Sequence, residues 1–378
     1  MEISLIVVVV VVVTALAFDF TNGFHDTANA VATAIATGAL KPRTAVIIAG
    51  VLNLVGAFLS VQVAKTISSG LVDETKITPT VIFAGLVGAI LWNLLTWLLG
   101  LPSSSSHALI GGLIGATVVA SGADAVKFAG IVGKVLLPAV LSPLIAGVIA
   151  LIATHLAYRI TARGAAGTVT KGFKVGQIVS SSMVALAHGT NDAQKTMGVI
   201  TLALITAGAL PTDAGPPFWV VLSAGLTIGL GTYMGGWRII HTLGRRVADI
   251  QTAQGFAAGT SSAAVILTSS HLGFPLSTTQ VATGSIFGAG AARGAASVRW
   301  GIAGQVALAW LLTLPAAAVV GALAAWVAVT GPVGTIIVAL VLVGFAVGIY
   351  AVSRRRPVNA HNVDELPAPP PPPLDVAA

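Results

Sequence analysis

The chain has 378 residues, of which 56% are hydrophobic and 8% are charged, and its formal net charge is +7. Soluble domains carry about 25% charged residues, so this composition predicts a polytopic membrane protein without a separate soluble domain. The basic residues are spread singly, without the aromatic-rich polar surface of a nucleic-acid site, so we expect no nucleic-acid partner. The absence of cysteine excludes disulfides and thiolate metal sites.

The first apolar segment, 3–40, lacks the basic region and cleavage site of a signal peptide, so we predict that it stays in the membrane. It is too long for one straight span, because about 20 residues cross a bilayer. Polar residues also interrupt it. We therefore expect the helix to break near Asn22-Gly23, which is tolerated at membrane depth where the backbone faces protein or a water-filled cavity.

Two further segments, 44–63 and 81–99, precede the serine run Ser103-Ser-Ser-Ser106. The apolar stretch after this run, 108–120, is too short to span the membrane. We therefore predict a re-entrant helical hairpin that carries the serines at its tip. A long proline-kinked segment up to Tyr158 completes the first half.

The second half repeats this order of segments. A segment at 175–207 is followed by a crossing at 218–236 and by a second predicted hairpin, 256–270 and 277–292. The last two predicted spans are 300–330 and 333–352. We therefore divide the chain into a first repeat at 1–158, a cytoplasmic linker formed by the polar loop 159–174, and a second repeat at 175–352. A disordered, proline-rich cytoplasmic tail is predicted at 353–378.

Two polar motifs occupy matching places in the two halves, Asn22-Gly-Phe-His-Asp-Thr-Ala-Asn-Ala30 and His188-Gly-Thr-Asn-Asp-Ala-Gln-Lys-Thr196. Aligned on their glycines, they place Asp26 opposite Asp192 and Asn29 opposite Lys195. A carboxylate at membrane depth is expensive and marks a functional site, so the pair predicts one site built from both repeats. Asp19 has no acidic counterpart in the second half, and structural and functional roles both stay open for it.

The hairpin tips form a second matching pair. After the aligned residues Pro102 and Pro275, the tips pair as Ser104 with Ser277, Ser105 with Thr278, Ser106 with Thr279 and His107 with Gln280. Two separated motif pairs in the same order indicate an internal duplication of the chain.

Charge placement predicts how the chain lies in the membrane. With the N-terminus outside and each hairpin returning to its own side, fourteen Lys and Arg residues fall in inner loops and three, Lys65, Lys76 and Lys127, fall in outer loops. This bias follows the positive-inside rule and makes the C-terminus cytoplasmic. The predicted fold class is an all-α polytopic protein of the cell membrane, with inverted-topology repeats, broken helices and two re-entrant helical hairpins whose tips meet near the midplane.

The tips have the features of an anion site. Each places hydroxyl groups at the start of a short helix, where free backbone N–H groups and the positive end of the helix dipole favour an anion. The hydroxyls can donate hydrogen bonds to the oxygens of a tetrahedral anion.

The carboxylates Asp26 and Asp192 repel an anion unless cations bind with it. If each is protonated or holds a metal ion, the anion and the cations bind together, which is the physical basis of a symporter. Lys195 adds a fixed positive charge and is a candidate replacement for a mobile cation in the second half. A structural ion pair between Lys195 and either aspartate is the alternative.

These four motifs resemble the inorganic phosphate transporter (PiT) family over nearly all of residues 1–350. The resemblance implies an inverted-repeat transporter that moves phosphate with a cation as a homodimer. By position, the resemblance implies that the anion-binding residues are Ser104, Ser105, Ser106, Thr278, Thr279 and Gln280. It likewise makes Asp26, Asn29, Asp192 and Gln194 the cation-linked residues.

This chain departs from the family's common motif, Gly-Ala-Asn-Asp-Val-Ala-Asn-Ala, with His25 in the first copy and Gln194-Lys195 in the second. With these residues the chain is more similar to the bacterial, proton-coupled branch of the family than to its sodium-coupled members. In that branch phosphate travels free or as a neutral complex with a divalent metal such as Mg²⁺. The coupling ion, H⁺ or Na⁺, stays open.

Other functions compete with phosphate import. One alternative is transport of sulfate, another tetrahedral oxyanion to which hydroxyls and helix starts can donate hydrogen bonds. A second alternative is an anion channel, which the carboxylates in the site disfavour. An intramembrane enzyme needs a general base beside Ser104 or Thr278, and His107 adjoins the first tip. Because Gln280 stands at the matching place in the second tip, we predict a transporter with no catalytic residue and no cofactor.

Overall fold

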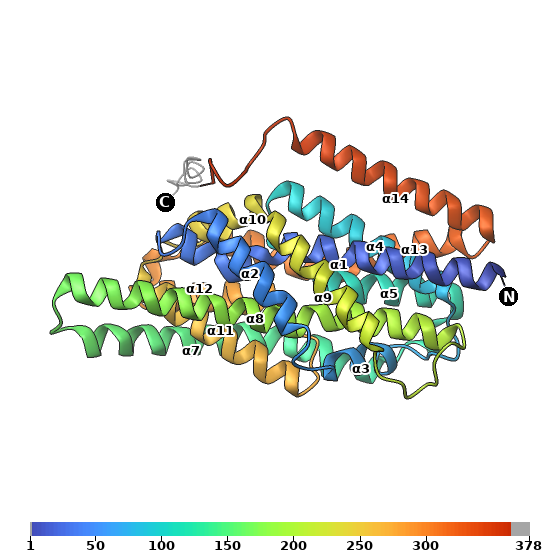
Figure 1. Ribbon diagram of the computed structural model, residues 1–378, viewed down its shortest axis with the longest axis horizontal. Coiled ribbons are helices and arrows are strands. Elements are labelled where there is room, and N and C mark those ends of the chain that lie inside the picture. The colour runs from blue at the N-terminus through green and yellow to red at the C-terminus, as the bar shows by residue number, and fades with distance from the viewer. Residues whose placement is uncertain (1, 364–378) are drawn as a thin grey trace, which may run out of the picture.

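The computed structural model describes residues 2–363, and this part of the chain is helical apart from turns and two isolated β-bridges (Figure 1). The start of α1 lies at one end of the long axis, and the end of α14 points toward the other. The helices are α1 (Glu2–Ala36), α2 (Pro42–Gly56), α3 (Gln62–Ser69), α4 (Pro79–Leu99), α5 (Ser105–Ser121), α6 (Phe128–Ile131), α7 (Leu137–Thr161), α8 (Ala166–Thr206), α9 (Phe218–Met234), α10 (Trp237–His241), α11 (Thr252–His271), α12 (Thr278–Ala291), α13 (Trp300–Ala328) and α14 (Pro332–Ser353).

Five helical segments within residues 2–363 are long and apolar enough to cross a membrane. A sixth candidate is the bent pair of α9 and the stretch Trp237–Arg246, which meet at 60°. The prediction of a polytopic, all-helical membrane protein is therefore confirmed. The five segments are Leu5–Ala36, Pro79–Leu99, Phe128–Thr161, Trp300–Ala328 and Pro332–Ser353.

The expected break near Asn22-Gly23 is wrong, because α1 runs without interruption through 35 residues. Gly23 serves helix packing: a Cβ there would lie 2.6 Å from the carbonyl oxygen of Ile228 on α9, so only glycine permits this close approach. The polar side chains around it find partners on other helices, and the helix has no need to open. A break does occur at Gly235, whose φ of 76° separates α9 from α10.

Both predicted hairpins are present. Helix α4 ends at Gly100, which has the left-handed φ of 65°, and α5 begins at Ser105. In the second half the turn lies between α11 and α12. The two tips touch, since Ser106 Oγ donates a hydrogen bond to Leu276 O at 3.0 Å. In Figure 1, α5 lies toward the N-terminal end of the long axis and α12 toward the opposite end.

The order of elements recurs along the chain. A long motif helix (α1, α8) is followed by a helix with a short successor (α2–α3, α9–α10), and then by a hairpin (α4–α5, α11–α12). Each hairpin leads into a single 3₁₀ turn, Ala123–Ala125 or Ala295–Ser297, and into an isolated antiparallel bridge, Val72 with Val126 or Ala248 with Val298. These paired details match the duplication read from the motifs.

Two polar segments are more ordered than expected. The stretch 159–174, expected as a polar loop, is mostly helical, because α7 extends to Thr161 and α8 already begins at Ala166. After α14 the chain crosses back, where His361 Nε2 lies 2.7 Å from Arg43 Nη2 and Val363 is buried against the ends of α1 and α10. The rest of the predicted tail, 364–378, lies outside the described residues.

Candidate functional site

The two motifs meet in the middle of the bundle, where α1 packs against α8. Asn22 Nδ2 lies 3.4 Å from Asp192 Oδ2, and one ligand atom from each of Asp26, His188 and Asp192 lies within 4.8 Å of the other two. Asp26 is 2% exposed and Asp192 is 0% exposed. The predicted convergence of the two aspartates is therefore seen, and His188 joins them.

Asp192, in the second motif, has a fixed positive partner. Lys195 Nζ donates to Asp192 Oδ1 at 2.6 Å, to Ser106 Oγ at 2.5 Å and to Leu276 O at 2.8 Å. All three ammonium protons are thus used in a position that is 0% exposed. The side chain of Lys195 therefore holds α8 and both hairpin tips together. Of the two ion pairs predicted for Lys195, with Asp26 or with Asp192, the pair with Asp192 is formed.

Asp26, in the first motif, has a histidine partner instead. Its Oδ1 lies 2.6 Å from Nδ1 of His25, and Nε2 of the same ring lies 3.1 Å from Thr96 Oγ1 and 3.3 Å from Ser103 Oγ. The imidazole therefore links the first carboxylate to the first hairpin. Thr96 and Ser103 were not among the predicted site residues, because nothing in their spacing connects them with the motif.

The starts of α5 and α12 have the same cap. Ser104 Oγ accepts from His107 N, and Ser277 Oγ accepts from Gln280 N, each at 3.2 Å. Aligned caps of this kind orient both helix starts alike. Ser104 therefore supports the helix start, and the hydroxyls of Ser105, Ser106, Thr278 and Thr279 follow it.

The second tip also contacts both motifs. Thr278 Oγ1 donates to Asp192 Oδ2 at 3.3 Å, and Asn29 Nδ2 donates to Thr279 Oγ1 at 3.1 Å. Ser105 Oγ of the first tip has no hydrogen-bond partner among the described residues. Carboxylates, an amide and hydroxyls from four helices thus share one buried region, which offers donors to an anion and oxygens to a cation.

Gln194 and Asn191 hold neighbouring backbone in place. Gln194 Oε1 accepts from the backbone N–H groups of Val63 at 2.8 Å and Ala64 at 3.3 Å, at the start of α3. Asn191 Nδ2 donates to Ser270 Oγ at 2.9 Å and to Phe274 O at 3.2 Å, next to the second tip. These contacts give both amides a structural role, and a part for Gln194 in cation binding stays a prediction.

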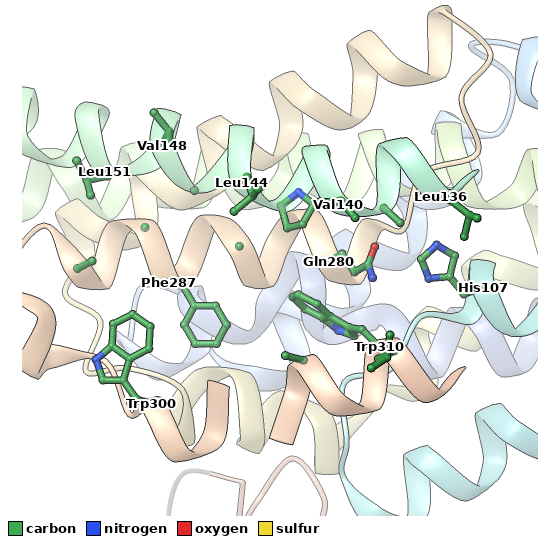
Figure 2. Close-up of a pocket in the computed structure, with 18 of the residues that line it drawn as sticks. His107, Leu136, Val140, Leu144, Val148, Leu151, Gln280, Phe287, Trp300 and Trp310 are labelled. Carbon is green, nitrogen blue, oxygen red and sulfur yellow. The ribbon is translucent and has the colours of Figure 1, made fainter. Parts of the chain in front are cut away.

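Gln280 and His107 face a separate groove between α7, α12 and α13 (Figure 2). The groove has a volume of about 690 Å³, and apart from these two residues and the indole rings of Trp300 and Trp310 its lining is aliphatic or aromatic carbon. An anion gains little from such a wall. The hydroxyls beside Asp192 are therefore better placed for the anion than Gln280.

Comparison with known proteins identifies the family. Residues 22–321 match the Phosphate transporter family. Relatives in Mycobacterium tuberculosis (strain H37Rv; 54% identical over 96% of this chain and 88% of the relative) and Bacillus subtilis (44% identical over 86% and 98%) are both named "Probable low-affinity inorganic phosphate transporter". A solved structure titled "The sodium-dependent phosphate transporter" matches with a TM-score of 0.76 and 26% identity, over 85% of this chain and 98% of that one.

Buried carboxylates beside paired helix starts, inside a bundle of membrane-spanning helices, are the arrangement of a transporter site. The chain belongs to the phosphate transporter family, which it matches over most of its length. Phosphate is therefore its substrate, as the family resemblance implied.

Proposed function

We propose that the protein imports inorganic phosphate across the cell membrane by symport with a cation, through alternating access. The observation that carries the proposal is the meeting of both hairpin tips with both motifs: Ser106 contacts Leu276, and Thr278 contacts Asp192. Phosphate would sit between the tips, where backbone N–H groups at two helix starts and the nearby hydroxyls donate to its oxygens.

The positive charge that the site needs comes from two sources. In the second half, the ammonium of Lys195 neutralises Asp192 within 2.6 Å. In the first half, the acidic and amide groups of α1, among them Asp26 and Asn29, are left for a mobile cation, which is H⁺ or Na⁺. An anion that enters beside Asp26 therefore binds more tightly when that cation is present, and this linkage couples the two flows.

Import as a neutral complex of phosphate with a divalent metal is a second form of the same proposal. His188, Asp26 and Asp192 could hold such an ion, because their ligand atoms lie within 4.8 Å of one another and imidazole and carboxylate both bind divalent metals. His188 Nδ1 is held by Asn53 Oδ1 at 2.5 Å, which orients Nε2 toward Asp192, 3.3 Å away. The metal would then be part of the cargo.

The proposal includes an orientation and an assembly. Inverted repeats, with the N-terminus outside and the C-terminus cytoplasmic, are supported by the charge bias of the loops and by the opposite placement of α5 and α12 along the long axis (Figure 1). A homodimer follows from the family resemblance alone.

Radiolabelled phosphate uptake into proteoliposomes tests the proposal, with pH and sodium gradients imposed separately, with and without Mg²⁺, and with sulfate as competitor. We expect one of the two cation gradients to drive accumulation of phosphate above its external concentration. We expect sulfate not to inhibit this accumulation. Accumulation of sulfate in place of phosphate would favour the other oxyanion. Equilibration without accumulation under every gradient would favour a channel.

A further inference from the structure

Asp19 is a fully buried carboxyl group without a charged partner. It lies on α1 two turns before Asp26, where Thr196 Oγ1 donates to its Oδ1 at 2.8 Å. Its Oδ2 has no hydrogen-bond partner, and no basic side chain within residues 2–363 forms an ion pair with it. The equivalent position in the second half is Ala185, so Asp19 breaks the symmetry of the repeats.

The surroundings of Asp19 do not supply the missing charge. The charged groups that face it are Asp192 and Lys195, both on α8, and the three ammonium protons of this lysine are already donated elsewhere. Helices α4 and α9, which also pack against α1, contain no Asp, Glu, Lys, Arg or His. A carboxylate ion in such a place is costly, so the group needs either a proton or a bound cation.

Asn22 adds a second, independent observation. It lies one helical turn from Asp19 on the same face of α1, is also fully buried, and its Oδ1 likewise has no donor among the described residues. Asp19 Oδ2 and Asn22 Oδ1 are thus two buried acceptors on one face of α1 without a donor within residues 2–363, and a proton bound to Asp19 Oδ2 would convert that atom into an O–H donor.

We propose that Asp19 binds the proton that moves with phosphate. The inference rests on the proposed function and names the coupling ion and its carrier. Asn22 Nδ2 also lies 3.4 Å from Asp192 Oδ2, which accepts from Thr278 of the second tip at 3.3 Å, so Asp19 lies one helical turn from a side chain that contacts the anion site. One proton binds from the outer side, crosses with the anion and leaves on the inner side.

Asp19→Asn is the test, because the amide has the same shape and cannot carry a proton. Purified protein in liposomes that contain a pH-sensitive dye is given phosphate on the outside. Phosphate counterflow, which needs no net proton movement, is measured in parallel. We expect Asp19→Asn to retain counterflow and to lose phosphate-driven acidification of the lumen, and ΔpH-driven accumulation, by about tenfold or more.

Asp213→Asn is the matched control, since Asp213 is exposed in the loop after α8, and we expect it to behave as the parent protein. Thr196→Val keeps the carboxyl group but removes its donor, and we expect it to shift the pH profile of uptake without uncoupling. If Asp19→Asn fails to fold, Asp19→Glu replaces it, and retained proton flux in that variant supports the proposal whereas lost flux overturns it.

The two proposals fail in different ways. Undiminished acidification in Asp19→Asn overturns the inference and leaves phosphate transport standing. The same holds if phosphate uptake by the parent protein follows a sodium gradient without proton flux. Loss of counterflow in a well-folded Asp19→Asn overturns it too, because the residue would then serve the anion site. No phosphate uptake by the parent protein would defeat the proposed function itself.

Discussion

Each copy of the motif places a carboxylate inside the membrane, and the two carboxylates have different partners. In the second half Asp192 is paired with Lys195, whose charge is part of the chain. In the first half Asp26 is paired with His25, whose charge depends on a proton. The second half is therefore neutralised from within, and under the proposed symport the first half exchanges its positive charge with the solution.

Under the proposed symport, this difference gives the two halves of the duplicated chain separate roles. Two identical halves would each need a mobile cation, and each would bind it equally well. With Asp192 paired permanently with an ammonium group that also holds both hairpin tips, the proposed symport leaves only the first half to bind a mobile cation. The following variants test or sharpen this contrast, beginning with the largest expected effect.

Asp192→Asn should abolish phosphate uptake and destabilise the protein more than Asp26→Asn does. Removing one partner of a buried ion pair leaves Lys195 without its carboxylate, which costs about 3–5 kcal/mol, whereas the partner of Asp26 is an imidazole and not a fixed charge. Uptake into proteoliposomes and thermal unfolding in detergent measure the two effects. Equal unfolding temperatures for the two variants would contradict the proposed contrast, and near-normal uptake by either would remove that aspartate from the site.

Ser105→Ala and Thr278→Ala should each raise the half-saturating phosphate concentration about tenfold, the effect of one hydrogen bond to a charged group. Their expression should change less than their affinity. Ser269→Ala is a suitable control, because that hydroxyl donates to Val265 O within its own helix. Unchanged phosphate affinity in both tip variants would argue against an anion site between the hairpins.

Lys195→Asn places the first-half residue in the second half. We expect uptake to acquire a new dependence on added sodium or lithium, because Asp192 then needs an external cation, and the initial rate to fall at low salt. Lys65→Asn changes an exposed lysine and serves as the control. Sodium and pH profiles identical to those of the parent protein would mean that Lys195 does not replace a cation.

The smallest effect is expected at the exposed ion pair between Lys76 and Asp124, 2.8 Å apart. The hydrogen bond from Lys76 lowers the pKa of the Asp124 carboxyl from its usual 3.8. Because the pKa of Asp124 is lower in the folded than in the unfolded state, the pair stabilises the folded protein at neutral pH. This contribution is lost as the pH falls from 3.8 through the lowered pKa of the folded state. Lys76→Ala should remove this acid dependence of thermal unfolding and leave phosphate uptake unchanged, and altered uptake would show that this loop serves transport.

Much of the architecture could be predicted because it depends on local patterns. The length of apolar segments revealed the five helical segments that are long and apolar enough to cross a membrane, but not that 44–63 is divided between the two shorter helices α2 and α3. A serine run before a stretch too short to cross revealed the first hairpin. The repetition of both motifs indicated that Asp26 and Asp192 converge, which the cluster with His188 confirms.

The remaining features depend on contacts between distant segments. Polar residues around Gly23 suggested a break, but α1 stays intact because Asn22, His25 and Asp26 find partners on other helices or on each other. The contact of Gln194 with the start of α3 and the groove in front of Gln280 could not be predicted from spacing within either repeat. Such roles are set by neighbours that no local pattern specifies.

The central claim is that both hairpin tips face one shared phosphate, and the natural absence of cysteine allows it to be measured directly. Single cysteines at Ser105 and at Thr278 are labelled with a small thiol reagent at increasing phosphate concentrations. We predict that phosphate slows labelling at both positions with the same half-effective concentration, that sulfate does not, and that Asp26→Asn removes the protection. Protection of one tip without the other, or equal protection by sulfate, would contradict the claim.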